Sequence, residues 1–418
     1  MENAQENKFL NFIKKNYLAV NLSILAVLFF INCFTQHAIW VVFPILLCFL
    51  MFGKLEDSYS YLLFSTPFCF VGGYTGLTVF FVVCGLFFIK YFCILVKQKN
   101  KLTKAQTIVL LIFLIYMVIP IGGYNINFLY RFVGIMLVLF TIWVLVNQPE
   151  ILNVKKNIRI FSLAVIISVL FSLLYFVSPY LQSSMMLNQE DGFIRFQALI
   201  GHPNTFALLC VIAMAILAHL FIQKPNWVDG VLFVLLALLG FLTLSKMYII
   251  LFAVIMLFVL IWLFKINWKK ALIVVAVLLA GVGVVAIIKP SIFTTIIHRF
   301  IGKGTGFGSF RDFMNAITTL RYDLWINYLS FMGTHPLRLI FGCGIGANVI
   351  DPLSPHNAYI SMIYQLGIVG TALFVAVIVL LFKSNKSKEK KKFQWSLLIP
   401  IIVLALICCI DDLVFHII

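Results

Sequence analysis

Long apolar runs recur from one end of this 418-residue chain to the other. Hydrophobic residue types make up 63% of the sequence and charged residues only 11%, against about 25% charged residues in an ordinary soluble domain. A run of about 20 apolar residues is what an α-helix needs to cross a bilayer. The composition therefore predicts a membrane protein with many spans and excludes a soluble enzyme.

The apolar runs predict an all-α polytopic fold of about 12–14 transmembrane helices with one large external loop that bears short helices. The second and third runs are short, so each is either re-entrant or tilted. The predicted spans are residues 17–35, 38–52, 58–71, 76–96, 106–123, 126–146, 158–181, 203–222, 227–244, 247–265, 270–288, 357–382 and 394–416.

The positions of the lysines predict the orientation of these spans in the membrane. With the N-terminus inside, 22 of the 31 basic residues fall at predicted cytoplasmic ends, as the positive-inside rule requires. The net charge of +17 is thus explained by topology, and no nucleic-acid partner is expected. The predicted organisation is N-terminal spans over 1–181, an external loop over 182–202, central spans over 203–288, a large external loop over 289–355 and C-terminal spans over 356–418.

The arginines follow the opposite rule. Six of the seven are predicted to be external, and a guanidinium offers a planar fork of donors that fits phosphate oxygens. One interpretation is that these arginines bind an anionic ligand on the outer side of the membrane. Pairing with nearby carboxylates, such as Glu190, Asp191, Asp312, Asp323 and Asp351, is the other. The external arginines are Arg131, Arg195, Arg299, Arg311, Arg321 and Arg338.

The large loop carries the most informative patterns. Residues 310–332 predict one helix with an apolar stripe, flanked by Arg321 and Trp325, and such a helix lying on the membrane could cover a cavity as a lid. The glycine loop 342–346 follows no Rossmann strand, so a nucleotide site is not expected there. A tight turn that seats the lid against the next helix is the preferred interpretation.

That next helix is predicted to begin at Ser354, as N-cap, with Pro355 in its first position. His356 and Asn357 then fall in the first turn, where the helix dipole favours an anion. A histidine at the mouth of a span can act as general base on a sugar hydroxyl. The alternative is a histidine that only hydrogen-bonds the loop.

These patterns resemble the Wzy/O-antigen ligase family of bacterial polysaccharide enzymes. Three motifs occur in the family's order, although Lys246 stands where the family commonly has arginine, which puts the role of that position in doubt. The motifs are Arg195-Phe196 with Gly201-His202-Pro203-Asn204, then Leu242-Thr243-Leu244-Ser245-Lys246, then Arg321-x-x-x-Trp325 with the glycine loop, His356-Asn357, Gly367 and Gly370.

The resemblance implies a glycosyltransferase that polymerises oligosaccharide repeat units linked to undecaprenyl pyrophosphate. It implies action on the outer face of the bacterial plasma membrane, without metal or cofactor, among membrane lipids and with a chain-length regulator as a partner. In this interpretation His356 accepts the proton, and Arg195 and Arg321 hold the pyrophosphate. The expected substrate-binding residues are Arg131, His202, Asn204, Arg311, Arg338 and Asn357.

Two alternatives stay open. A ligase that moves a finished glycan onto another acceptor shares the same motifs. A flippase or other transporter of lipid-linked oligosaccharide is a different class, but transporter charges usually lie near the bilayer midplane, whereas here they lie at predicted outer ends of spans and in loops.

Overall fold

The structure of the protein is a computed structural model, and its described part is helical except for one short hairpin. Strands β1 (Gln189–Glu190) and β2 (Phe193–Ile194) pair antiparallel. The all-α class is therefore confirmed for this part of the chain. The described residues are 16–69, 73–97, 103–119, 126–147, 152–184, 189–190, 193–288, 294, 309–347, 355–383 and 395–410.

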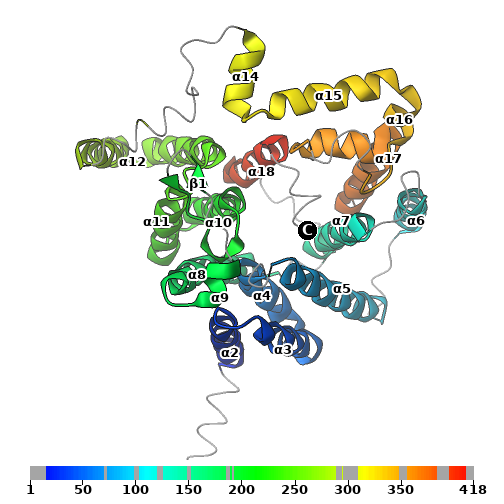
Figure 1. Cartoon of the computed structure of the whole chain (residues 1–418), viewed down its shortest axis with the longest axis horizontal. Coiled ribbons are helices and arrows are strands. Elements are labelled where there is room, and N and C mark those ends of the chain that lie inside the picture. Colours follow the sequence, from blue (N-terminus) through cyan, green and yellow to red (C-terminus); the bar gives the residue numbers. More distant parts are fainter. Residues whose placement is uncertain are drawn as a thin grey trace, which may run out of the picture. The chain divides into compact units, whose positions relative to one another are not determined.

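The chain divides into two compact units, which are described separately. Unit 1 comprises residues 1–100, 148–213 and 231–243, and unit 2 comprises residues 101–147, 214–230 and 244–418. Figure 1 labels the helices of both units along the chain.

Unit 1 is built from helices of 6 to 25 residues, together with part of α10 (Pro203–Gln223) and most of α11 (Trp227–Phe241). Helix α4 packs against both α3 and α8. Lys156 on α8 donates a hydrogen bond to Asp57 on α4 at 2.9 Å, so this contact includes an ion pair. The remaining elements are α2 (Tyr17–Asn32), η1 (Gln36–Ala38), α3 (Ile39–Phe52), α4 (Leu55–Ser65), η2 (Thr66–Phe68), α5 (Gly73–Lys97), α8 (Val154–Ser172), η3 (Leu173–Phe176), α9 (Pro179–Ser184) and η4 (Ala198–Ile200).

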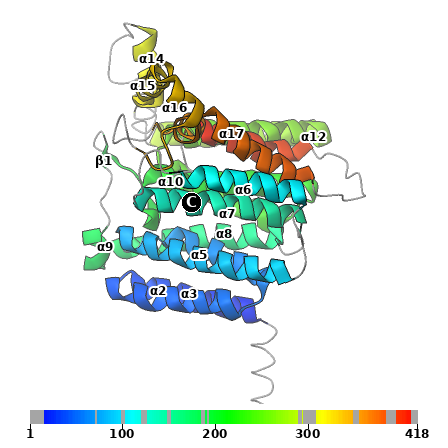
Figure 2. The same ribbon diagram turned by 90° about the vertical axis from the view of Figure 1, so that its right-hand side faces the viewer.

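Unit 2 is organised around α17 (Ala358–Lys383), which packs against α6, α7, α15, α16 and α18. Figure 2 shows α6 and α7 running alongside each other near α17. Buried apolar side chains of α6, α7 and α17 form the shared core of these three helices, among them Phe113, Ile135 and Phe374. The other elements are α6 (Lys104–Val118), α7 (Ile126–Asn147), α12 (Lys246–Ile288), α14 (Phe310–Thr318), α15 (Arg321–Thr334), α16 (Pro336–Phe341), η5 (Trp395–Leu397) and α18 (Leu398–Ile410).

Helix α12 covers two of the predicted spans, 247–265 and 270–288. The break falls at Asn267, whose φ of −158° and ψ of 98° are not helical. The predicted cytoplasmic turn at residues 265–270 is therefore a sharp kink at one residue, and helical structure resumes directly after it.

Four of the described helices are long and apolar enough to cross a membrane, which agrees with a polytopic fold. Shorter apolar helices of 10 to 17 residues accompany them, so the exact number of spans stays a prediction. The four long candidates are Val154–Phe176, Pro203–Gln223, Lys246–Lys269 and Ala358–Leu381.

The prediction of a single helix over residues 310–332 is wrong. The structure has two helices, α14 and α15, because Thr319 and Leu320 adopt left-handed backbone conformations with φ of 58° and 64°. The side chains of Thr318 and Asn315 accept hydrogen bonds from the backbone N–H groups of Tyr322 and Asp323. The end of α14 thus satisfies two N–H groups in the first turn of α15, which makes the corner favourable.

Candidate functional site

The glycine loop 342–346 is fixed by backbone hydrogen bonds to α17. The N–H groups of Cys343 and Gly344 donate to the carbonyls of Tyr364 and Gln365 at 2.8 and 3.0 Å. The Gly346 N–H donates to the Gln365 side-chain oxygen at 3.2 Å. The expected tight turn against the helix that follows His356 is confirmed.

Helix α17 is broken at the point where this loop contacts it. Gly367 has a φ of 66°, and a Cβ atom there would overlap the Gly342 nitrogen and the Ile340 carbonyl oxygen. Gly342 has a φ of 78°, and a Cβ atom there would overlap the Gln365 carbonyl oxygen. Glycine is required at both positions because the two backbones touch and both residues are left-handed.

Tyr116, on α6, completes this contact. Its hydroxyl oxygen lies 2.7 Å from the carbonyl oxygens of both Phe341 and Leu366. The Tyr116 O–H group therefore donates at the place where the residue before the glycine loop meets the break in α17. Gly370 lies against the Tyr116 ring, where a Cβ atom would overlap it. Tyr116 was not predicted from the sequence, where its only signal is a hydroxyl within an apolar run, which needs a partner when buried.

We expect Gly367→Ala to destabilise the protein strongly. With φ of 66° and ψ of −179°, Gly367 has a backbone conformation that essentially only glycine adopts, which costs alanine about 1–3 kcal/mol, and the overlap with Gly342 adds to that cost. The measurement is the thermal unfolding midpoint of purified protein in detergent. Gly333→Ala is the matched control, because nothing lies within 4 Å of a Cβ atom there and alanine favours a helix by about 1 kcal/mol. Equal midpoints for both variants would contradict the assigned contact.

The prediction that His356 and Asn357 lie in the first turn of a helix is wrong. Helix α17 begins at Ala358, and Asn357 is its N-cap. The Asn357 side-chain oxygen accepts from the N–H groups of Tyr359 and Ile360 at 3.1 Å, and its carbonyl accepts from Ser361 at 2.8 Å. Asparagine is the better cap because its side chain reaches these donors. The predicted N-cap Ser354 lies outside the described residues.

His356 is held in an unusual conformation just before this cap. Its φ is 48°, and it is half-buried. Left-handed residues other than glycine are uncommon, and such strain persists where the surrounding structure fixes it. On one side of His356 lies the Asn357 cap. On the other, Trp325 Nε1 donates a hydrogen bond to the Pro355 carbonyl at 2.8 Å.

The Trp325 bond joins α15, the helix that carries Arg321, to the segment that carries His356. Arg321 is the first residue of α15, one helical turn before Trp325, and it is half-buried. The helix also packs on α17 through the rings of Tyr328 and Tyr364, whose centroids are 4.8 Å apart. The structure thus brings the segments of two predicted catalytic residues together within unit 2.

Arg311 and Asp323 form an ion pair between α14 and α15. The Arg311 Nε donates to the Asp323 carboxylate at 2.6 Å, and 61% of the Arg311 side chain is exposed. This hydrogen bond lowers the pKa of Asp323 and raises the pKa of Arg311. The geometry favours the carboxylate-pairing alternative for Arg311, so its predicted role in substrate binding stays untested.

The other predicted arginines of unit 2 lie in different surroundings. Arg338 on α16 is half-buried near the glycine loop. Burial raises the pKa of the Cys343 thiol, and the positive charge of Arg338 opposes this rise. Arg131 lies in the second turn of α7 and is buried. Neither observation assigns a ligand, so both roles remain predictions.

The upstream motif forms a separate cluster in unit 1. Arg195 Nη2 donates to Asn204 Oδ1 at 2.7 Å, and its Nε donates to the Thr243 carbonyl at 3.2 Å. Pro203 is the first residue of α10, as predicted, and the exposed His202 precedes it. Arg195 therefore links the start of α10 to the turn after α11, while substrate binding by Arg195, His202 and Asn204 remains a prediction.

Lys246, the position that departs from the family pattern, has a clear structural contact. Its ammonium donates a hydrogen bond to the Ala316 carbonyl at 2.7 Å, which ties the start of α12 to α14. Several other residues named from the sequence lie outside the described residues. They are Asp191, Arg299 and Asp351.

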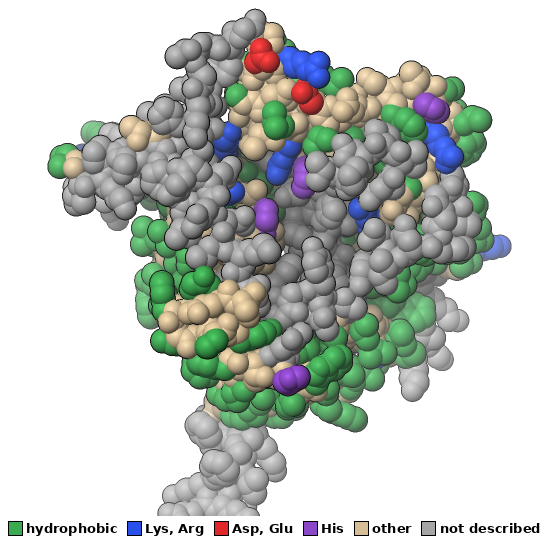
Figure 3. Space-filling model, viewed as in Figure 1, with side chains coloured by type: hydrophobic (Ala, Val, Ile, Leu, Met, Phe, Trp, Pro, Cys, Tyr) green, Lys and Arg blue, Asp and Glu red, His purple; other side chains and the backbone are tan. Residues whose placement is uncertain are grey.

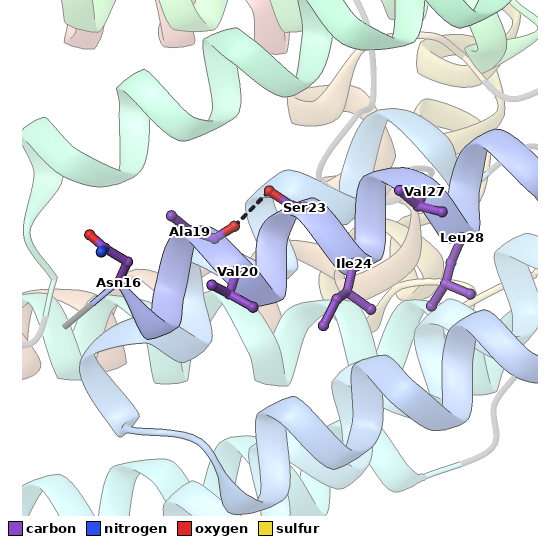
Figure 4. Close-up of a pocket in the computed structure, with 7 residues that line it drawn as sticks. All are labelled: Asn16, Ala19, Val20, Ser23, Ile24, Val27 and Leu28. Atoms are coloured by element: carbon purple, nitrogen blue, oxygen red, sulfur yellow. Dashed lines mark hydrogen bonds between the residues drawn. The ribbon is translucent and has the colours of Figure 1, made fainter. Parts of the chain in front are cut away.

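An apolar surface pocket lies along one face of α2 in unit 1 (Figure 4). The hydroxyl of Ser23 donates to the Ala19 carbonyl at 2.9 Å, so this polar group is satisfied within the helix. None of the predicted site residues lines this pocket, and it does not define the candidate site. Its lining residues are Asn16, Ala19, Val20, Ser23, Ile24, Val27 and Leu28.

The described helices and the motif residues around the start of α17 define an all-α polytopic membrane protein. Residues 231–375 match the family model of the O-antigen ligases, which supports the resemblance to that family. The match includes Arg321, the glycine loop and His356, but not Arg131, Arg195, His202 or Asn204. Searches of curated proteins and of solved structures gave no match. At the level of the family, the domain supports glycan transfer of the ligase or polymerase type.

Proposed function

We propose that the protein polymerises lipid-linked oligosaccharide repeat units on the outer face of the bacterial plasma membrane. The observation that carries this proposal is the fixed, left-handed His356 between the Asn357 cap and the Trp325–Pro355 hydrogen bond, within the matched domain. A histidine held in this way is positioned by its neighbours on both sides, which suits a group that must meet a reacting hydroxyl.

In the proposed reaction, the terminal hydroxyl of an incoming repeat unit attacks the anomeric carbon of the growing glycan. The new carbon–oxygen bond forms as the bond to undecaprenyl pyrophosphate breaks, and the pyrophosphate leaves with the electron pair. His356 Nδ1 or Nε2 accepts the proton of the attacking hydroxyl. The energy comes from the sugar–phosphate bond, so the reaction needs no nucleotide.

The pyrophosphate gains negative charge as it leaves, and fixed guanidinium groups stabilise such charge. Arg321 is the first candidate, because α15 is joined to the segment of His356. Arg195 is the second, on the strength of its sequence motif. Arg131, His202, Asn204, Arg311, Arg338 and Asn357 complete the proposed substrate-binding set, although the Asn357 side chain already caps α17.

The test is glycan lengthening by purified protein in lipid nanodiscs, supplied with lipid-linked repeat units alone. Polymerisation predicts a ladder of products that persists in EDTA, because the proposed reaction is metal-independent. A ligase leaves repeat units unextended until a different acceptor is added. A flippase moves the substrate across a liposome membrane without changing its length, and either of these results would replace the proposal.

The proposed orientation has its own test. In a cysteine-free background, Ser330→Cys on α15 is expected to react with a membrane-impermeant maleimide in intact cells, because the segment 289–355 is proposed to lie outside. Lys224→Cys, next to the end of α10, is expected to react only after the cells are opened. Both positions are exposed, so accessibility within the protein is matched. The reverse labelling pattern would invert the topology and place His356 in the cytoplasm.

A further inference from the structure

Helix α14 has two faces of opposite character. At about 100° per residue, Phe310, Phe313, Met314 and Ile317 lie within one stripe, which is called the apolar face here. Phe310 is 69% exposed and Phe313 is 39% exposed, although both are large and aromatic. No residue of α14 is buried. Such separation in a short exposed helix is typical of helices that lie in a membrane interface.

The polar face of α14 is satisfied within the protein and carries little net charge. Arg311 pairs with Asp323 on α15. Ser309 accepts from the Asp312 N–H and donates to the Asp312 carboxylate at 2.7 Å. Figure 3 shows the charged side chains of α14 and α15 exposed together with apolar ones. Because two carboxylates accompany one guanidinium, attraction to anionic lipid is not what this helix offers.

The position of α14 follows from Lys246. This residue is the first of α12, whose segment Lys246–Lys269 is the most apolar of the candidate spans, and its ammonium is bonded to the Ala316 carbonyl of α14. An exposed apolar stripe follows Lys246 along α12 and suits contact with lipid tails. Its residues are Ile250, Leu257 and Ile261. Helix α14 is therefore held beside the first residue of the candidate span Lys246–Lys269, at the end of that span.

We infer that the apolar face of α14 inserts into the lipid leaflet at the mouth of α12. The ligand is the bilayer itself, at the boundary of headgroups and acyl chains, where a helix of this kind is buried by about 5–10 Å. This role does not depend on the glycan-transfer reaction.

The test uses photocrosslinking of the full chain with all its cysteines. Benzoylphenylalanine replaces Phe310 or Phe313 in turn, and the protein is placed in nanodiscs of phosphatidylcholine that contain no polyprenyl lipid. Mass spectrometry then separates phospholipid adducts from crosslinks to protein. We expect phospholipid adducts at both positions, several-fold above those at the exposed position 312 on the opposite face, where the Asp312 carboxylate accepts a hydrogen bond from Ser309.

Crosslinks to protein, within one chain or between copies, would show that protein covers the apolar face and would overturn the inference. Equal and low adduct yields at positions 310, 313 and 312 would place the face in water and would also overturn it. If a benzoylphenylalanine variant does not accumulate, Phe310→Trp gives a second readout. Brominated phosphatidylcholine must then quench more fluorescence than in the wild type, and unchanged quenching would refute the insertion.

Discussion

His356→Asn is expected to give a folded, membrane-inserted protein that extends glycan about 10²–10⁴-fold more slowly than the wild type. Asparagine can hydrogen-bond the loop, but it cannot accept a proton near neutral pH. It also tolerates the left-handed conformation that position 356 requires, so the backbone should be kept. The measurement is the chain-length distribution made by matched amounts of purified protein.

A second variant separates chemistry from structure at this position. His356→Leu should lower expression as well as activity, because a bulky apolar residue with φ near 48° is strained. Long polymer from His356→Asn at the wild-type rate would remove the histidine from the reaction and leave it a structural role.

Arg321→Lys is expected to lower the rate of glycan extension about 10²-fold, by analogy with the loss of one donor to a developing charge. Lysine keeps the positive charge but loses the planar fork that binds two phosphate oxygens together. The residue is half-buried at the start of α15, so its geometry is more constrained than that of a surface arginine. Steady-state rates at saturating lipid-linked donor give the comparison.

Arg159→Lys is the matched control, since Arg159 is also half-buried, lies on α8 and is not among the proposed site residues. We expect its rate of glycan extension to stay close to the wild-type rate, because the same substitution is made outside the proposed site. Equal losses for the two variants would mean that the loss at Arg321 does not come from the proposed site. A normal rate for Arg321→Lys would reduce that arginine to a surface charge.

The fold class and the family resemblance of the motifs between Leu242 and Gly370 could be predicted from the sequence because both depend on strong, regular signals. Apolar runs reveal helices, and the spacing from Arg321 to Trp325 places them on one face of α15, as the structure shows. The glycine loop was also assigned correctly as a tight turn, since a glycine-rich segment outside a Rossmann unit has few other uses.

The corner at Thr319–Leu320 and the cap at Asn357 could not be predicted with the same methods. The apolar stripe continues across residues 318–321, so periodicity gives no sign that the chain turns there. At the start of α17, Ser354 and Asn357 are both good N-caps, and only the Trp325–Pro355 bond and the conformation of His356 select between them. Both errors arise because contacts distant in sequence decided a local question.

The interlocked glycines Gly342 and Gly367 also determine how this protein could be recombined with a relative. Each glycine needs the other's backbone at van der Waals distance, so the segments 340–346 and 364–370 form one inherited block. A chimera whose crossover falls between them, for instance at position 356, pairs a loop from one parent with a broken helix from the other. Crossovers after residue 370 keep the block whole, and these are the junctions at which exchange of acceptor or donor preference could be explored without dismantling the scaffold.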